Sequence, residues 1–169
     1  MDDCEQMRIF DEWLNRHSGL MFRVVRAFAF TQADRDDLFQ EVALRVWQSV
    51  PTFRGEASSA TWIYRVSLYA AVAWSRSEKK HRSRTRELEE EGVLVEIPHA
   101  LDARLEWLYE QIAKLDEIDR SVTLLMLEGF SYRIIGVMLG MSEGHVAVKI
   151  NRIKAHQNKR AIKEKTYGV

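Results

Sequence analysis

The sequence predicts an all-α protein: two small helical domains joined by a linker, the C-terminal one a four-helix domain with a helix-turn-helix. Apolar residues recur at intervals of three and four along most of the chain, as in amphipathic helices. Only two prolines interrupt the 169 residues, and 46% of the residues are apolar, which suffices for packed cores with short connections. Near the C-terminus, two short helical stretches flank a tight turn, and this arrangement predicts the helix-turn-helix.

The first domain is expected to span residues 1–81 and to open with a helical core segment over residues 7–30. A second helix is expected from about residue 32 to residue 49. Thr31 is a suitable N-cap for it, and the acidic first turn that follows suits the positive end of the helix dipole. Pro51 ends this helix because proline lacks the backbone N–H group.

The predicted second helix has two different faces. Its apolar face consists of Phe39, Val42, Ala43, Val46 and Val50. Its polar face consists of Asp37, Glu41, Arg45 and Gln48, at spacings of three and four. Composition alone does not exclude that the polar face is an ordinary solvated surface.

A polar loop over residues 52–59 separates the second helix from a long third helix, expected over residues 60–80. Aromatic and basic side chains alternate along this third helix: Trp62, Tyr64, Arg65, Tyr69, Trp74 and Arg76. Aromatic rings can stack on unpaired bases while arginine and lysine hold phosphates, so the pattern is typical of single-strand binding. Packing in the protein core is the alternative for each aromatic residue.

Residues 82–99 are interpreted as the linker, because they change charge sign midway and contain a glycine and a proline. The second domain is expected over residues 100–169. Two apolar stripes predict its first two helices: Leu101, Leu105, Leu108, Ile112 and Leu115, then Ile118, Val122, Leu125 and Met126.

The helix-turn-helix follows, with Ser131 and Ser142 as N-caps and Gly140 where its first helix must stop. The second helix of the motif buries Val146, Ile150 and Ile153. Its opposite face is small, polar or basic and consists of Gly144, His145, Val148, Asn151, Arg152 and Ala155, flanked by Lys149 and Lys154. Such a face suits a DNA major groove, although an ordinary surface helix would also fit.

Charge is segregated along the chain although the net charge is zero. Residues 61–86 hold seven Lys or Arg against one acid, residues 87–119 hold eleven acids against two bases, and residues 143–169 hold seven bases against two acids. Two basic blocks on a chain with a helix-turn-helix fit two separate contacts with DNA. The acidic block between them could fold over a basic face when DNA is absent.

Several classes of function are disfavoured by the residue content. The five histidines are scattered without the spacing of metal ligands, and the single cysteine, Cys4, cannot form an internal disulfide. Glycine-rich phosphate loops, nucleophile motifs, a secretory signal and a membrane-spanning apolar run are not found in the sequence. We therefore expect a cytoplasmic protein that is not an enzyme and needs no cofactor or metal.

Two stretches resemble a known family. LDEIDRSVTLLMLEGFSYRIIGVMLGMSEGHVAVKINRIK, residues 115–154, resembles region four of the extracytoplasmic-function sigma factors. DLFQEVALRVWQSVPTFRGEASSATWIYRV, residues 37–66, resembles region two of the same family. These proteins are promoter-recognition subunits of bacterial RNA polymerase, so the resemblance implies core polymerase and promoter DNA as partners. It also implies an anti-sigma factor, which could hold the protein at the membrane.

The resemblance assigns roles to three groups of residues. Docking on core polymerase is implied for Asp37, Gln40, Glu41, Arg45 and Trp47, with a core position as an equal alternative for Trp47. Recognition and melting of the minus-ten element is implied for Arg54, Trp62, Arg65, Tyr69, Trp74 and Arg76. Recognition of the minus-thirty-five element is implied for Ser142, His145, Val148, Lys149, Asn151, Arg152 and Lys154.

The chain departs from the family pattern at several positions, including Ala147 and Val148, which stand where basic or hydroxyl-bearing residues are frequent. Tyr69 and Ala73 stand where asparagine is frequent, which puts the minus-ten sequence in doubt. Ile134 stands where the family commonly has the glutamate of a capping box, and Val137 replaces what is often a charged residue. Ile134 and Val137 are either covered, by the first domain or by a partner such as the anti-sigma factor, or tolerated on the surface; we expect a covered patch.

Two other classes of function stay open. One is a helix-turn-helix regulator that binds DNA without polymerase. The other is a helical interaction module whose basic faces bind acidic proteins. Dependence on core polymerase separates these two classes from a sigma factor. A regulator should bind a specific DNA site without polymerase, and an interaction module should bind no specific site. A sigma factor should show little specific binding until polymerase is present.

Overall fold

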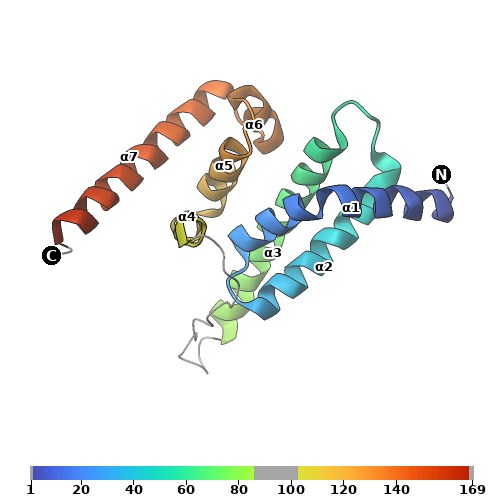
Figure 1. The fold of residues 1–169 in the computed structure, drawn as a ribbon, viewed down its shortest axis with the longest axis horizontal. Helices are drawn as coiled ribbons and strands as arrows, with labels where there is room; N and C mark the ends of the chain where they lie inside the picture. Colours follow the sequence, from blue (N-terminus) through green and yellow to red (C-terminus); the bar gives the residue numbers. More distant parts are fainter. Residues whose placement is uncertain (1, 86–102, 168–169) are drawn as a thin grey trace. The chain divides into compact units, whose positions relative to one another are not determined.

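The computed structural model describes residues 2–85 and 103–167, and these are helical apart from short connections (Figure 1). The prediction of an all-α chain is confirmed. Contacts divide the chain into two compact units, unit 1 over Met1–Ala113 and unit 2 over Lys114–Val169. Among the described residues, no helix is both long enough and apolar enough to cross a membrane.

Three helices form the body of unit 1: α1 (Asp3–Phe28), α2 (Gln32–Ser49) and α3 (Ser59–Thr85). They lie side by side and each packs on the other two (Figure 1). Their core contains the fully buried side chains Met21, Val24, Leu38, Ile63 and Leu68. Removing these apolar groups from water is the main stabilising contribution in such a small unit.

Helix α2 has the predicted bounds. The Thr31 hydroxyl accepts a hydrogen bond from the backbone N–H of Asp34 at 3.0 Å, which confirms the N-cap. A short 3₁₀ helix, η1 (Val50–Thr52), follows and contains Pro51. The predicted apolar face omitted Leu38, which is fully buried, whereas Phe39 is only half-buried.

Helix α3 continues to Thr85, beyond the predicted end at residue 80 and into the predicted linker. The stretch KKHRSRT contains neither glycine nor proline, and its basic residues suit the negative end of the helix dipole. Residues 86–102, which contain most of the predicted linker and Leu101, lie outside the described residues.

The four helices predicted for the C-terminal part are all present, beginning with α4 (Ala103–Ala113). By its contacts α4 groups with unit 1, where it packs on α1. The Arg26 guanidinium of α1 lies 4.5 Å from the ring centroid of Tyr109 on α4. The contact-based division therefore falls after Ala113, whereas the sequence placed the start of the second domain at residue 100.

Unit 2 contains α5 (Glu117–Leu127), α6 (Tyr132–Leu139) and α7 (Glu143–Tyr167). Helix α7 packs on both α5 and α6. Buried side chains from all three helices form the core: Val122, Leu125, Ile135, Val146 and Ile150. Ile118 of the predicted apolar stripe is instead exposed.

The turn between α6 and α7 is as tight as predicted. Gly140 ends α6 in the left-handed conformation, with φ 68°, which suits glycine because it has no Cβ. The hydroxyl oxygens of Ser131 and Ser142 accept hydrogen bonds from the backbone N–H groups of Ile134 and His145, at 3.4 and 3.2 Å. Both predicted N-caps are confirmed.

Gly136 is the point of closest approach within this motif. A Cβ built at Gly136 would lie 2.5 Å from the carbonyl oxygen of Met141. At Gly144, by contrast, an added Cβ would meet nothing within 4 Å. The helix-turn-helix therefore requires glycine at position 136 but not at position 144.

We expect Gly136→Ala to destabilise unit 2 by about 1 to 3 kcal/mol, because the backbone of the turn would have to move to accommodate the methyl group. Gly144→Ala is the matched control and should be neutral or stabilising by up to about 1 kcal/mol. Urea unfolding of the full chain, followed by circular dichroism, measures both. Equal midpoints for the two variants would contradict the close approach.

Candidate nucleic-acid interface

The outer face of α2 carries four of the five residues predicted to dock on polymerase. Asp37, Gln40 and Arg45 are exposed and Glu41 is half-buried. Arg45 Nε donates a hydrogen bond to Glu41 Oε1 at 2.7 Å, so the pair forms an i,i+4 salt bridge on the helix surface. The face is therefore polar and already ordered.

Leu44 lies on the same face and was missed by the sequence reasoning. Its side chain is 47% exposed, although it sits among polar neighbours. An apolar residue three positions after Glu41 and four after Gln40 was the signal that could have revealed it. Protein interfaces commonly have an apolar centre within a polar rim, and an exposed leucine among polar groups fits that arrangement.

Trp47, the fifth predicted docking residue, is half-buried. Its indole Nε1 is buried without a hydrogen-bond partner among the described residues, and its backbone carbonyl accepts a hydrogen bond from Gln6 Nε2 at 3.0 Å. The side chain thus has part of its ring in the core and part at the surface.

A groove of about 530 Å³ runs between α2 and α3. Its walls combine residues from two predicted sites, because Glu41 and Arg45 of the docking group face Tyr69 and Trp74 of the minus-ten group. Tyr69 is 51% exposed and Trp74 is half-buried. The groove thus offers aromatic surface beside an ion pair, a combination that can accept a planar group or an apolar side chain.

Trp62 and Arg65, also predicted to contact the minus-ten element, contact each other. The Arg65 guanidinium lies 4.5 Å from the Trp62 ring centroid, and Trp62 Nε1 donates a hydrogen bond to Ser49 Oγ at 3.0 Å. Arg54, in the loop before α3, and Arg76, near the end of α3, are exposed. Of the six predicted minus-ten residues, three are therefore exposed and three, Trp62, Arg65 and Trp74, are half-buried.

Helix α7 presents the predicted recognition face. Val146 and Ile150 are buried and Ile153 is nearly so, as the helical period predicted. The exposed residues are Ser142, His145, Val148, Asn151, Arg152 and Lys154. Six of the seven residues predicted for the minus-thirty-five contact are therefore accessible along one helix.

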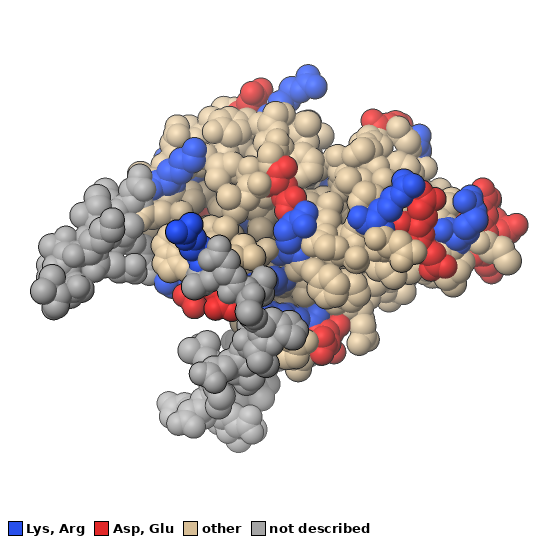
Figure 2. Space-filling model, viewed as in Figure 1, with Lys and Arg blue, Asp and Glu red and all other residues tan. Residues whose placement is uncertain are grey.

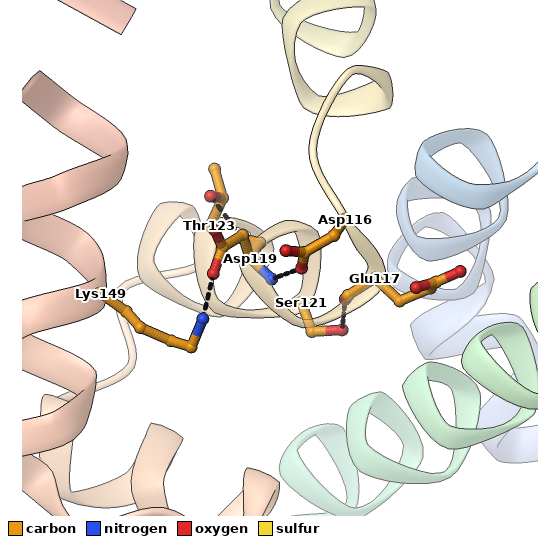
Figure 3. Close-up of polar contacts among 6 residues, drawn as sticks. All are labelled: Asp116, Glu117, Asp119, Ser121, Thr123 and Lys149. Atoms are coloured by element: carbon orange, nitrogen blue, oxygen red, sulfur yellow. Dashed lines mark hydrogen bonds and ion pairs between the residues drawn. The ribbon is translucent and has the colours of Figure 1, made fainter. Parts of the chain in front are cut away.

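Lys149 is the seventh, and it has a partner within unit 2. Its Nζ donates to Asp119 Oδ1 at 2.5 Å, and both side chains are mostly buried (Figure 3). Asp119 is held in place because its backbone N–H donates to Asp116 Oδ1 and its carbonyl accepts from the Thr123 hydroxyl (Figure 3). This contact joins a residue of the acidic block to one of the basic block, and Asp119 was not singled out by the sequence reasoning.

Two exposed apolar residues stand out on α6. Val137 is 74% exposed and Ile134 is 38% exposed. The covering surface that the sequence reasoning expected for this pair stays a prediction.

Charges of both signs alternate on part of unit 1. In the face drawn in Figure 2, Lys and Arg side chains lie next to Asp and Glu side chains at the end where α1 begins. Arg16 and Glu12 of α1 also form an i,i+4 salt bridge at 3.2 Å. That end of the visible face is therefore not a patch of a single sign, as a phosphate backbone would require.

Family comparison matches the two halves of the chain separately. The profile described as Sigma-70 region 2 matches residues 13–81, and the profile described as Sigma-70, region 4 matches residues 105–156. The second match thus begins within α4. The order of the two matches is the order in which the sequence resemblance placed these regions.

Relatives and solved structures agree with these matches. The chain is 27% identical to the ECF RNA polymerase sigma factor SigM of Mycobacterium tuberculosis over 151 residues, which covers 86% of this chain and 74% of SigM. The fold is similar to that of the sigma factor RpoE from Bartonella quintana, solved with the anti-sigma factor NepR (TM-score 0.71, 15% identity, 88% and 93% of the two chains). It is also similar to CnrH, solved with the cytosolic domain of CnrY (TM-score 0.66, 20% identity, 94% and 90% of the two chains).

We expect Lys149→Ala to destabilise unit 2 by about 1 to 2 kcal/mol, between the values typical of exposed and buried ion pairs. Asp119→Ala should have a similar effect, and the double variant should cost less than the sum of the two, because both remove the same contact. Lys154→Ala, an exposed lysine on the same helix, is the control and should leave urea unfolding unchanged. Additive effects of Lys149→Ala and Asp119→Ala would show that the ion pair contributes nothing.

Proposed function

The chain belongs to the extracytoplasmic-function sigma factors, and from this premise we propose which surfaces it uses to direct core RNA polymerase to its promoters. It is an alternative sigma factor, a regulator of transcription. The observation that carries the proposal is the pairing of two surfaces on one chain: a polar face of α2 in the region-two match and an exposed recognition helix in the region-four match.

The exposed face of α2 is the proposed docking surface for core polymerase. Asp37, Gln40 and Arg45 supply polar contacts, and Leu44 supplies the apolar centre, where desolvation yields most of the binding energy. The Glu41–Arg45 pair is preformed, so little side-chain entropy is lost when the partner binds.

Helix α3, the groove and the loop before α3 form the proposed surface for the minus-ten element. Tyr69 and Trp74 offer aromatic faces to unpaired bases, and the exposed Arg54 and Arg76 offer cations to phosphates. Binding single-stranded DNA in this way favours the melted promoter over the duplex.

The proposed contact with the minus-thirty-five element is the outward face of α7 in a major groove. Arg152 is the main candidate donor to a guanine, Asn151 can read an adenine, and Val148 can contact a thymine methyl group. Lys154 reaches phosphates in this proposal, while Lys149 supports the helix through Asp119.

An anti-sigma factor is the proposed regulator. The solved neighbours RpoE and CnrH were crystallised with NepR and CnrY, and this chain exposes Ile134 and Val137 on α6. An apolar helix or strand of the anti-sigma factor would cover these two residues and exclude polymerase. Since the proposed partners, polymerase and promoter DNA, are in the bacterial cytoplasm, we also place the active protein there.

Run-off transcription with purified core polymerase on fragmented genomic DNA of the source organism tests the whole proposal. Promoter-specific transcripts that appear only when the chain is added would support it. A chain that binds a specific DNA site equally well without polymerase would instead be a regulator of the independent type.

Charge reversal on α2 tests the docking surface. We expect Glu41→Lys combined with Arg45→Glu to weaken core-polymerase binding at least about 10-fold. Polymerase groups that attract Glu41 and Arg45 would repel the reversed charges. Leu44→Ala should weaken it by about 1 to 3 kcal/mol if Leu44 is the apolar centre. Competition for core polymerase measures both, and Arg16→Ala on α1 is an exposed control. Normal binding by all variants, with unchanged circular dichroism, would make the face an ordinary solvated surface.

Two substitutions on α7 separate base reading from phosphate binding. Arg152→Ala should cost about 1 to 3 kcal/mol at the preferred minus-thirty-five element and relax the preference at one base pair. Lys154→Ala should weaken binding to all sequences alike. It should also reduce, by about 1, the slope of the logarithm of the binding constant against the logarithm of the salt concentration. Holoenzyme binding to a library of minus-thirty-five variants at several salt concentrations gives both quantities. Uniform weakening by Arg152→Ala would contradict this placement of the helix.

A further inference from the structure

Lys149 stands among the residues proposed to face DNA, but its charge is directed elsewhere. On α7 it follows His145 by four residues and precedes Arg152 by three, and residues at these spacings share one face of a helix. His145 and Arg152 are exposed, whereas Lys149 is half-buried. Its Nζ donates to Asp119 Oδ1 of α5 at 2.5 Å (Figure 3). The ammonium group of Lys149 is therefore used inside unit 2.

Asp119 is held in the place where it meets this lysine. It lies in the first turn of α5, where the positive end of the helix dipole favours a carboxylate. Its backbone N–H donates to Asp116 Oδ1 at 2.8 Å, and its carbonyl accepts from the hydroxyl of the buried Thr123 at 2.7 Å. Both contacts use the backbone of Asp119, so neither of them occupies its carboxylate.

The surroundings of the pair make exchange of Asp119 for a phosphate unfavourable. The side chains of Lys149 and Asp119 are only 21% and 27% exposed, so water and salt screen their attraction less than that of an exposed pair. A phosphate that took the ammonium group would leave the Asp119 carboxylate mostly buried, without its cation and near a polyanion. Lys154, which is exposed on the same helix, meets no such obstacle.

We infer that Asp119 holds Lys149 away from the phosphates of DNA and thereby lowers the affinity of unit 2 for duplexes of any sequence. This inference rests on the proposed function, because it takes α7 as the helix that enters the major groove. Contacts with phosphates carry no sequence information. A lower affinity for phosphates limits the time that the chain spends on the large excess of competing DNA.

Asp119→Asn tests this role because it removes the charge but keeps the size of the side chain and both backbone hydrogen bonds. We expect the full chain to bind a duplex of arbitrary sequence about 3- to 10-fold more tightly at ~0.1 M salt. The slope of the logarithm of the binding constant against the logarithm of the salt concentration should become steeper by about 1, as for one added phosphate contact. Fluorescence anisotropy of a labelled duplex, without polymerase, measures both quantities.

Lys149→Gln supplies the matched background. Alone, it should change neither the affinity nor the salt slope, because Lys149 does not contact DNA in the wild-type chain. Asp119→Asn added to Lys149→Gln removes the same negative charge but releases no lysine, and it should not tighten binding. The difference between the effects of Asp119→Asn in the two backgrounds isolates the part of Lys149. Lys154→Ala is the positive control and should make the slope shallower by about 1.

Base preference separates this role from one in orienting the helix. Holoenzyme with Asp119→Asn should retain the wild-type preference at each position of a library of minus-thirty-five variants, because a released lysine reaches phosphates only. A shifted or relaxed preference would mean that the pair orients α7, and it would overturn the inference.

Three results on the duplex would also overturn it. Asp119→Asn could leave affinity and slope unchanged, it could tighten binding equally in both backgrounds, or Lys149→Gln alone could weaken binding and flatten the slope. Circular dichroism establishes that each variant is folded, and Asp119→Ser replaces Asp119→Asn if the latter is not. If Arg152→Ala and Lys154→Ala also leave duplex binding and minus-thirty-five binding unchanged, DNA does not contact α7. The proposed minus-thirty-five surface then fails together with the inference, whereas an effect of these two variants alone leaves that surface standing.

Discussion

Helix α2 has to satisfy opposite requirements on its two faces, and the rest of unit 1 depends on this constraint. Leu38, Val42 and Val46 recur every four residues and are fully buried, which commits one side of the helix to the core. The other side stays in solvent and carries the Glu41–Arg45 pair. Because α3 packs on the same helix, Glu41 and Arg45 of α2 form one wall of the groove and residues of α3 form the other. Ser49 at the end of α2 accepts the hydrogen bond from Trp62 Nε1 of α3. A displacement of α2 would therefore also alter the start of α3 and the loop between the two helices.

Several side chains suited to nucleic acid are already engaged within the protein. Lys149 is paired with Asp119, and Trp62 is covered by Arg65. Nucleic acid would have to compete with these contacts, which have no association entropy to lose because both partners belong to one folded chain. Arg152 and Tyr69 are instead exposed to solvent. Lys149 and Trp62 therefore serve the packing of the protein itself.

Local chemistry explains which features the sequence predicted well. The bounds of α2, the caps Ser131 and Ser142 and the stop at Gly140 depend on residues close in sequence, and each was predicted correctly. The contact of Lys149 with Asp119 joins residues 30 positions apart, and no periodic pattern encodes it. Leu44 was missed for another reason: the sequence analysis placed it on neither face of α2, and only the packing of α1 and α3 on this helix shows which of its apolar residues stay exposed.

Helix α4 shows how a family region and a packed unit can differ. The region-four match begins at residue 105, inside α4, yet α4 packs on α1 and groups with unit 1. An 11-residue helix is too short to be stable alone in water, so it must bury an apolar side against some neighbour. Ile112 is buried, and the guanidinium of Arg26 covers the ring of Tyr109. The cation–π contact joins α4 to α1, whereas the region-four match places the same helix with the helix-turn-helix. The grouping of α4 with unit 1 thus follows from its packing on α1, which the family boundary does not reflect.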